Sequence, residues 1–440
     1  MAGEWPTLSL REAHVTLIDC DHRTPPASDA GYPYVAIPQL RNGRIDLSEA
    51  RRISREHFVD WTRKAMPAAN DVVLSRRCNP GETAFVPPRL EFALGQNLVL
   101  LRADGVKVYP PFLRWLVQGP EWWEQIGKFL NVGAVFDSLR CADIPNFELH
   151  IPPLTEQRAI AQILGTLDDK IDQNRRMNET LEAIARALFK SWFVDFDPVR
   201  AKAEGRDPGL PRHIADLFPD SFEDSELGEI PKGWETGPFA GTIEIRGGGT
   251  PKTSSPDYWN GPIPWFSVVD APNDTEVWVI DTEKKITQAG VKNSSTQVLS
   301  AGTTIITARG TVGRIALVGI PMAMNQSCYG LRGKADRHGY YTYFATRQLV
   351  SSLQQRAHGS VFDTITRDTL ASVTVFVPPV SLVEAFEKTV GPTLERIRTG
   401  LFASRTLAAL RGTLLPKLIS GELRVPSVNR VTKGKRDGHN

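Results

Sequence analysis

The chain contains little cysteine and no cysteine pattern. Four cysteines occur among 440 residues, namely Cys20, Cys78, Cys141 and Cys328. No two of them form a CxxC pair, and no histidine stands at ligand spacing, so neither a zinc site nor a disulfide framework is indicated. We interpret the four as reduced structural residues and expect no metal site.

Long apolar runs are also missing. No stretch approaches the ~20 apolar residues that a membrane helix needs, and Glu4, Arg11 and Glu12 do not suit the apolar core of a signal peptide. A hydrophobic content of 41% and a charged content of 23% are typical of a globular protein. We therefore expect a cytoplasmic protein without membrane contact. Its length predicts two or more domains.

Neither a strong net charge nor a catalytic motif is present. The net charge is only +2, so any nucleic-acid contact must come from local patches. GxxxxGK[ST] and HExxH are absent. Gly247–Gly249 is followed by Thr250 and Pro251, which favours a turn over a nucleotide loop. Asp168–Asp169 predicts a solvated helix face. We expect no catalytic residue and no bound cofactor, which favours a binding or targeting role.

The dominant feature present is an internal repeat. Gly133–Asp137 (GAVFD) returns in the second half of the chain as Gly359–Asp363 (GSVFD). The same offset relates Ile151–Pro153 to Val377–Pro379 and continues without a gap into the helical stretches that follow. Each half is therefore one unit, a globular module followed by a long helix.

Both globular modules, residues 1–153 and 235–379, show short apolar runs punctuated by Gly and Pro, which predicts strand-rich α/β modules. Thr24–Pro25 corresponds to Thr250–Pro251, and Gln96 corresponds to Gln326 after a small shift. A similar shift aligns Leu74–Arg76 with Thr307–Arg309. We interpret the glutamine recurrence as a shared structural hydrogen bond. The loops differ in length between the two modules, while the matching segments keep the same order along the chain.

After each module the apolar period becomes helical. Residues 154–195 carry a heptad seam of more than four repeats, which predicts a coiled-coil helix. Residues 380–420 repeat it less regularly, and we expect Gly391–Pro392 to kink or break this second helix. The candidate positions for helix pairing and partner contact are Ile160, Leu164, Leu167, Ile171, Asn174, Asn178, Leu181, Leu188, Phe386, Val390, Ile397, Leu407 and Leu414.

The order of the segments predicts an antiparallel helix pair. Residues 196–234 contain five prolines and predict a linker, while residues 421–440 predict a basic disordered tail. The first helix then leads from one module to the other and the second returns, with a pseudo-twofold axis across the seam. Asn174 and Asn178 either fix its register or are solvated.

Several long motifs now identify a resemblance. The runs Ile151–Ala161, Leu188–Phe193, Glu226–Trp234 and Leu415–Leu423 resemble conserved stretches of the specificity subunits of type I restriction-modification systems. The resemblance covers nearly the whole chain, although Val380–Glu384 departs from the pattern of the first helix. It implies a mixed α/β fold with two similar target-recognition domains, separated by two long antiparallel coiled-coil helices.

The resemblance also implies a division of labour. Each module would read one half of a split site in double-stranded DNA, and the helices would set the gap. Two modification subunits would bind S-adenosylmethionine and methylate adenine, and two restriction subunits would use ATP and Mg to translocate and cleave DNA. This chain would carry no chemistry itself.

Arginine and lysine side chains at loops or strand ends are the candidates for DNA contact, because they can bind phosphates or guanine edges. The candidates are Arg41, Arg44, Arg76 and Arg77 in the first module, and Lys252, Arg309 and Arg314 in the second. Two alternative functions remain open. One is a specificity subunit of another restriction-methylation or methylation-only assembly, and the other is a coiled-coil scaffold that binds proteins.

Overall fold

The computed structural model describes residues 5–133, 136–272, 276–334, 339–356 and 364–425. The chain forms two compact units. Unit 1 comprises residues 1–170 and 406–440, and unit 2 comprises residues 171–405. The predicted tail from residue 426 onward lies outside the described residues. No helix of the described residues is long and apolar enough to span a membrane.

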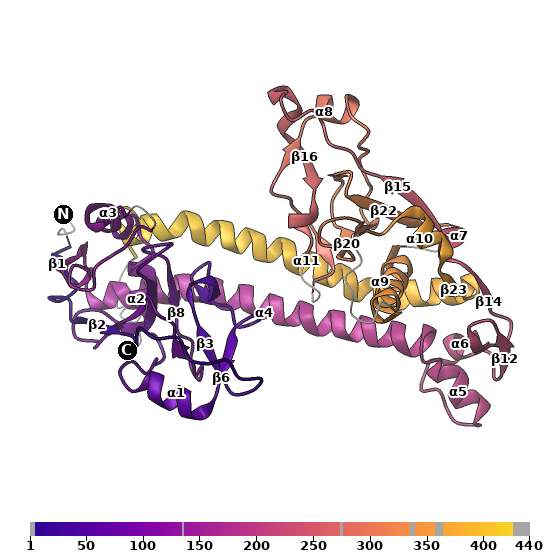
Figure 1. The fold of residues 1–440 in the computed structure, drawn as a ribbon, viewed down its shortest axis with the longest axis horizontal. Helices are drawn as coiled ribbons and strands as arrows, with labels where there is room; N and C mark the ends of the chain where they lie inside the picture. Colours follow the sequence, from indigo (N-terminus) through magenta and orange to yellow (C-terminus); the bar gives the residue numbers. More distant parts are fainter. Residues whose placement is uncertain (1–4, 134–135, 273–275, 335–338, 357–363, 426–440) are drawn as a thin grey trace, which may run out of the picture. The chain divides into compact units, whose positions relative to one another are not determined.

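Two long helices carry the internal repeat. Helix α4 spans Leu154–Phe193 and α11 spans Val380–Ile419, and each has 40 residues. Their first residues and their last residues are separated by the same offset as Gly133 and Gly359, so the repeat is kept along the full length of the helices (Figure 1). The predicted pair of long helices is confirmed.

Helix α11 does not end at Gly391–Pro392. Pro392 lacks the backbone N–H of an interior helical residue. On either side of it, however, Val390 and Leu394 are 2% and 0% exposed in the hydrophobic core of unit 2. Burial of both turns holds the helix together across the proline, because tertiary packing contributes more helical stability than local propensity.

Module 1 is built from short strands. They are β1 (Thr7–Ser9), β2 (Val15–Asp19), β3 (Tyr32–Val35), β4 (Leu40–Arg41), β5 (Arg44–Ile45), β6 (Arg51–Ile53), β7 (Val72–Ser75), β8 (Thr83–Phe85), β9 (Ala93–Leu94), β10 (Leu98–Ala103) and β11 (Glu148–His150). Its helices are α1 (Arg55–Thr62), α2 (Pro110–Leu116) and α3 (Pro120–Phe129), with 3-10 turns η1 (Ile37–Gln39) and η2 (Ile144–Asn146). The strands form sheets β2-β10-β7-β8, β6-β3-β9, β1-β11 and the hairpin β4-β5.

Module 2 has the same plan. Its strands are β14 (Glu235–Pro238), β15 (Ile243–Gly247), β16 (Trp259–Phe266), β17 (Trp278–Val279), β18 (Lys285–Ile286), β19 (Thr304–Thr307), β20 (Ile315–Val318), β21 (Ala323–Met324), β22 (Cys328–Gly333) and β23 (Thr374–Val377). Its helices are α7 (Phe239–Thr242), α8 (Gln288–Lys292), α9 (Gly339–Arg356) and α10 (Arg367–Ser372), with η3 (Pro256–Tyr258) and η4 (Val268–Asp270). The sheets are β15-β22-β19-β20-β17, β18-β16-β21 and β14-β23.

Apart from the hairpin β4-β5, which occurs only in module 1, the sheets of the two modules correspond in strand order. The main sheet of module 2 adds only β17, beside β20. In each three-stranded sheet, the middle strand pairs antiparallel with one neighbour and parallel with the other. The small sheets β1-β11 and β14-β23 are both antiparallel. The repeat read from the sequence is therefore a repeat of topology.

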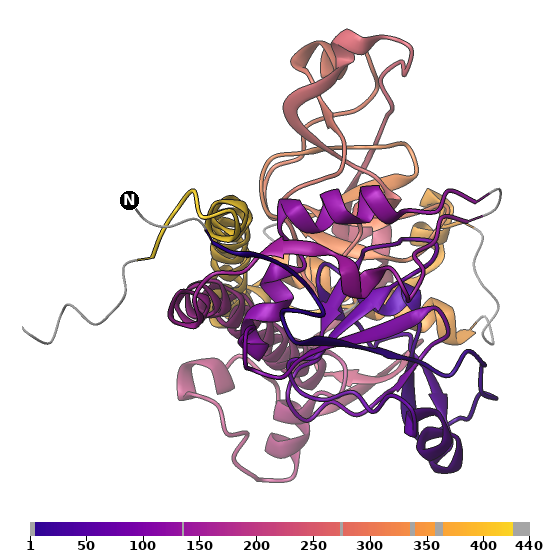
Figure 2. The same cartoon turned by 90° about the vertical axis from the view of Figure 1, so that its left-hand side faces the viewer.

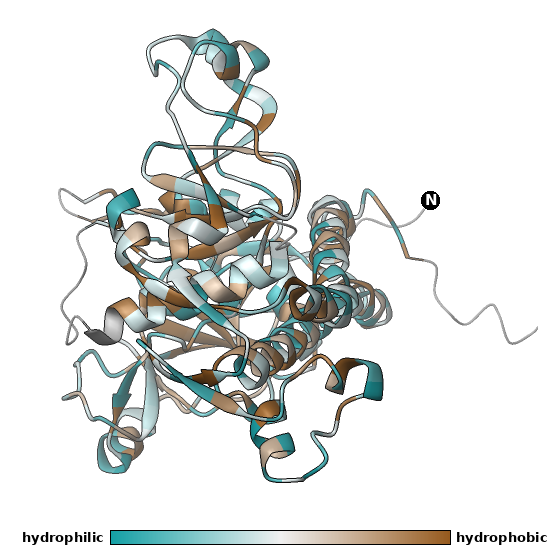
Figure 3. Cartoon of the chain, turned by 90° about the vertical axis from the view of Figure 1, so that its right-hand side faces the viewer, coloured by the Kyte–Doolittle hydropathy of each residue, from teal (hydrophilic) through white to brown (hydrophobic). Residues whose placement is uncertain are grey.

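The cores of both units include residues of the long helices. Ile160 and Leu164 of α4 join Leu418 of α11 in the core of unit 1, where Figure 2 shows the helices beside the strands of module 1. In unit 2, Phe189 of α4 packs 5.7 Å from Phe386 of α11 between ring centroids. Hydropathy colouring shows apolar residues on the central strands and polar residues on many loops (Figure 3).

The segment between α4 and module 2 is more than a linker. It contains α5 (Asp197–Ala203), α6 (Arg212–Ala215), β12 (Phe222–Ser225) and β13 (Gly228–Pro231). Val199 and Phe218 are buried in the core of unit 2. Helix α4 ends at Phe193, and Asp197 and Pro198 begin α5 after a left-handed residue, Phe196, with φ of 58°.

Candidate nucleic-acid interface

Three loops of module 1 meet beyond the ends of β7 and β10. The backbone N–H of Arg76 donates to Asn97 O at 2.9 Å, and that of Leu139 donates to Arg76 O at 2.9 Å. Thr24, which follows β2, reaches the same loops through Gln96. We call Thr24 with residues 76–82, 95–97 and 138–139 loop cluster 1.

Module 2 builds the same arrangement. The N–H of Ala308 donates to Ser327 O at 2.7 Å, and the N–H of Ile365 donates to Ala308 O at 2.9 Å. Ile365 occupies the position of the repeat that corresponds to Leu139. We call Thr250 with residues 308–314, 325–327 and 364–365 loop cluster 2.

A threonine–glutamine hydrogen bond closes each cluster. Gln96 Nε2 donates to Thr24 Oγ1 at 3.0 Å in module 1, and Thr250 Oγ1 donates to Gln326 Oε1 in module 2. The interpretation of the two glutamines as a shared structural hydrogen bond is confirmed.

The structure corrects the alignment of the arginines by one residue. The sequence comparison places Arg76 opposite Arg309, but the hydrogen bonds make Ala308 the counterpart of Arg76. Arg77 forms an isolated bridge with Ser138, and Arg309 forms the same bridge with Thr364. Arg77 is therefore the counterpart of Arg309, and both side chains are exposed.

Three other predicted DNA-contact residues lie in or beside these clusters. Arg76 is half-buried and donates through Nη1 to Leu139 O at 3.4 Å. Arg314 ends the loop 308–314 and donates through Nη1 to Pro272 O at 3.4 Å. Lys252 is exposed, two residues after Thr250. The clusters thus gather five of the seven candidates.

The other two candidates lie on the hairpin β4-β5. Arg41 is exposed and donates to Asp46 Oδ2 at 3.2 Å. Arg44 is directed toward α4, where its Nη2 lies 3.3 Å from Asp168 Oδ2. Arg44 therefore takes part in the internal packing of unit 1.

Asp168 corrects the expectation of a solvated helix face. Its side chain is only 6% exposed. It binds Arg411 of α11, Arg44 of β5 and Arg114 of α2, the last at 3.6 Å. Burial lowers the pKa of the Arg114 guanidinium. The expectation was wrong because the three arginines come from distant segments that only the fold assembles around one carboxylate.

All predicted helix-pairing residues are buried or half-buried. In unit 2, Asn174 Nδ2 donates across the seam to Ser404 Oγ at 3.1 Å. Asn178 faces Gly400, where an added Cβ would come within 2.8 Å of Asn178 Oδ1. The partner moves from 404 to 400 as α4 advances from 174 to 178, so this part of the seam is antiparallel. The repeat offset relates Asn174 to Gly400 and Asn178 to Ser404, so each pair corresponds to the other pair with its two helices exchanged. A local pseudo-twofold axis has this property.

Gly247 ends β15, and Gly248 and Gly249 lie where chain segments approach each other closely. A Cβ on Gly248 would come within 1.9 Å of Asn325 O, and one on Gly249 within 2.3 Å of Ser295 Oγ. Trp265 Nε1 also donates to Gly249 O at 3.0 Å. These glycines are needed for packing, because no side chain fits there.

One polar group was missed in the sequence. Asp19, Cys20 and His22 place possible ligand atoms within 4.8 Å of one another. His22 Nε2 lies 3.0 Å from Asp19 Oδ2, and Lys64 Nζ lies 3.8 Å from the same oxygen. Burial raises the pKa of the Cys20 thiol to about 11. A protonated thiol and a neighbouring ammonium favour a hydrogen-bonded group over a cation site.

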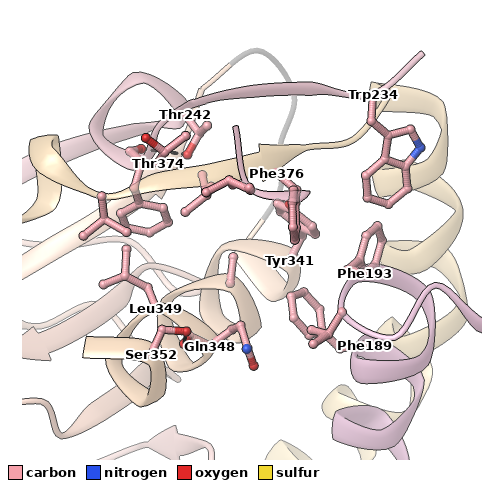
Figure 4. Close-up of a pocket in the computed structure, with 16 residues that line it drawn as sticks. Phe189, Phe193, Trp234, Thr242, Tyr341, Gln348, Leu349, Ser352, Thr374 and Phe376 are labelled. Atoms are coloured by element: carbon pink, nitrogen blue, oxygen red, sulfur yellow. Dashed lines mark hydrogen bonds between the residues drawn. The ribbon is translucent and has the colours of Figure 1, made fainter. Parts of the chain in front are cut away.

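An apolar pocket in unit 2 offers no comparable chemistry (Figure 4). It has a volume of about 270 Å³ and is lined by residues from the end of α4, from α7 and α9, and from β23. Phe189, Phe193 and Phe376 line it, and its lining contains no Asp, Glu, His, Cys, Lys or Arg. Such a wall suits neither phosphate binding nor acid-base chemistry.

Comparison with known proteins connects these features. A family model described as the type I restriction modification DNA specificity domain matches residues 22–183 and, a second time, residues 231–382. The chain belongs to this family. Each of its two specificity domains contains one loop cluster and continues into one of the long helices or its first residues.

Known specificity subunits resemble the chain over most of its length. The HindI specificity subunit of Haemophilus influenzae is 24% identical over 409 residues, which cover 82% of this chain and 88% of that protein. The MjaIX specificity subunit of Methanocaldococcus jannaschii is 25% identical over 398 residues, which cover 89% of this chain and 87% of that protein. The crystal structure of a type I S subunit from M. genitalium shares the fold, with a TM-score of 0.57 and 16% identity. The match covers 95% of this chain and 97% of that chain.

Proposed function

We propose that this chain is the non-catalytic DNA-recognition subunit of a type I restriction-modification complex, and that it reads an asymmetric bipartite site in double-stranded DNA. The repeated loop cluster carries the proposal. Two modules of one topology present the same three loops, with exposed Arg77 and Arg309 at equivalent positions. Differences in the remaining loops would give the two halves of the site different sequences.

The helices act as the ruler between the half-sites. A helix of 40 residues is about 60 Å long at ~1.5 Å per residue. Half-sites on one face of DNA are separated by about 34 Å per helical turn. A stiff element on this scale fixes the gap, while the modules set the sequences.

The chemistry belongs to partner subunits. Two modification subunits supply S-adenosylmethionine-dependent adenine methylation, and two restriction subunits supply ATP- and Mg-dependent translocation and cleavage. Ile184 of α4 and Leu410 of α11 are 56% and 46% exposed, and they occupy equivalent positions of the repeat. Exposed apolar side chains at repeat-related positions fit two copies of one partner.

Mapping methylated adenines in DNA that carries this system tests the recognition proposal. We expect one bipartite motif with a constant gap. Exchange of residues 1–153 for another module changes one half of the motif, and insertion of one heptad into each helix changes only the gap. A continuous short motif, or a change in both halves after a single exchange, contradicts the model. The absence of any sequence-specific methylated motif would favour the protein-binding scaffold.

Partner recruitment has a separate test. Ile184→Glu and Leu410→Glu each reduce the number of bound modification subunits from two to one, measured by native mass spectrometry. Val59→Glu is the control, because Val59 is 59% exposed on α1 and outside both long helices. Undiminished binding of two subunits by both variants would place the contact elsewhere.

A further inference from the structure

The loop 76–82 of module 1 has the same backbone as the loop 308–314 of module 2. Each closes with the same pair of hydrogen bonds onto the strand residue that precedes it. In module 1, Ser75 N donates to Glu82 O at 2.9 Å and Gly81 N donates to Ser75 O at 3.0 Å. In module 2, Thr307 N donates to Arg314 O at 2.9 Å and Gly313 N donates to Thr307 O at 2.9 Å. The offset between these loops, from Ser75 to Thr307, is slightly larger than the offset between the long helices.

Left-handed residues occur at the same two positions of both loops. Cys78 has φ of 64° and its counterpart Gly310 has φ of 81°. Gly81 and Gly313 have φ of 94° and 85°. Because a non-glycine residue rarely adopts such a φ, Cys78 shows that the loop shape is kept even without glycine.

Most side chains of the loop differ between the modules. Asn79 and Pro80 are replaced by Thr311 and Val312, and the charge reverses where Glu82 is replaced by Arg314. Both loops carry an arginine at the equivalent position, Arg77 in module 1 and Arg309 in module 2, and both side chains are exposed. In both modules this arginine bridges the segment that follows the GxVFD repeat, through Ser138 or Thr364.

A residue kept at one backbone position, while its neighbours diverge, serves a feature that both half-sites share. The sugar-phosphate backbone is the part of DNA that does not vary with sequence, and arginine binds its phosphates through charge-assisted hydrogen bonds. We propose that Arg77 and Arg309 each bind a backbone phosphate and set the register of their module on its half-site, without reading a base. This inference rests on the proposed function.

The first experiment measures affinity and salt dependence in the complex with the modification subunits. Arg77→Ala and Arg309→Ala are compared on a target duplex and on a duplex with scrambled half-sites. We expect each variant to weaken binding to both duplexes by the same factor, roughly tenfold, and to reduce the slope of log affinity against log salt by about 1. The methylated motif stays unchanged, and Arg→Lys variants keep most of the binding.

Arg212→Ala is the matched control for loss of one positive charge. Its side chain is 95% exposed on α6, outside both modules, so it leaves affinity and salt slope at the wild-type values. A relaxed half-site in the methylated motif of Arg77→Ala or Arg309→Ala would make that arginine a base reader and overturn the inference. An unchanged salt slope in both variants would overturn it as well. If the wild-type complex itself does not bind the target, the proposed function fails first.

A second measurement leaves the arginines in place. Cys78 is exposed beside Arg77, whereas Cys20 and Cys328 are buried and burial raises the pKa of their thiols to about 11 and 12. Alkylation of the native complex therefore labels Cys78 before those two, with sites assigned by mass spectrometry. Gly310→Cys provides the equivalent thiol in module 2. Target DNA slows alkylation at both positions, and an unchanged rate at either excludes phosphate binding beside it.

Discussion

Gln96 donates its amide to the Thr24 hydroxyl at 3.0 Å, across 72 residues of chain. Thr250 and Gln326 form the same pair in module 2, with the hydroxyl as donor. A proline follows the threonine in both modules. The bond thus connects the loop after β2 to the loop that leads into β10 in module 1, and the loop after β15 to the loop that leads into β22 in module 2.

Removal of this hydroxyl should weaken DNA binding with little effect on stability. Both bonds are exposed, so Thr24→Val and Thr250→Val lower the free energy of unfolding by about 1 kcal/mol or less. Each variant lowers the affinity of the complex for target DNA, because its loop is no longer held. Thr→Ser variants, which keep the hydroxyl, retain wild-type binding. Thermal melts and titrations with a labelled duplex check both effects, and equal binding by Val and Ser variants would contradict the role.

Asp168→Asn should destabilise unit 1 strongly. The substitution leaves Arg44, Arg114 and Arg411 without their shared carboxylate. Loss of one partner from a buried ionic group costs roughly 3–5 kcal/mol. Asp169→Asn, one residue further and exposed, is the control and stays within about 0.5 kcal/mol of wild type. Urea denaturation measures both, and equal stability of the two variants would count against the cluster.

The stability of unit 2 should fall between about pH 4.5 and pH 7. Burial raises the pKa of Glu387 to about 7, above its ordinary value of about 4.5. The folded protein keeps a proton that the unfolded chain releases in this window, so the stabilisation is complete below pH 4.5 and is lost as the pH rises through 7.

Glu387→Gln should flatten this pH dependence. The amide cannot ionise and keeps an oxygen to accept the hydrogen bond from Tyr341 N, which is 2.7 Å long in the wild type. Above pH 7 the variant is more stable than wild type by about 1–3 kcal/mol. Melting temperatures from pH 5 to pH 8 test this, with Glu384→Gln as a control one turn earlier. Parallel curves for Glu387→Gln and wild type would exclude the assignment.

Two glycines of α11 should respond differently to alanine. Gly412 has nothing within 4 Å of an added Cβ, so Gly412→Ala stabilises the helix by about 0.5–1 kcal/mol. At Gly400 the added Cβ meets Asn178 Oδ1 at 2.8 Å, and Gly400→Ala loses that gain. In an Asn178→Ala background the gain returns. A double-mutant cycle of unfolding free energies measures the coupling, and additive effects would argue against contact across the seam.

Local patterns in the sequence determined the helices, the repeat and the family. Heptad spacing acts between residues on the same helix, and a repeat with one fixed offset needs only comparison along the chain. Short apolar runs punctuated by Gly and Pro likewise indicated strand-rich modules, and one such run, Ile315–Val318, forms β20. These features are local, so the linear sequence is enough to find them.

The tertiary structure decided which polar groups are available. Asp168 and Arg44 read as a solvated acid and a DNA-contacting base, yet the fold buries their contact because β5, α2 and α11 converge on one turn of α4. It also decided that Arg77, and not Arg76, corresponds to Arg309, since hydrogen bonds between distant strands and loops set that register. Burial and long-range pairing depend on segments brought together only by folding, and no local pattern encodes them.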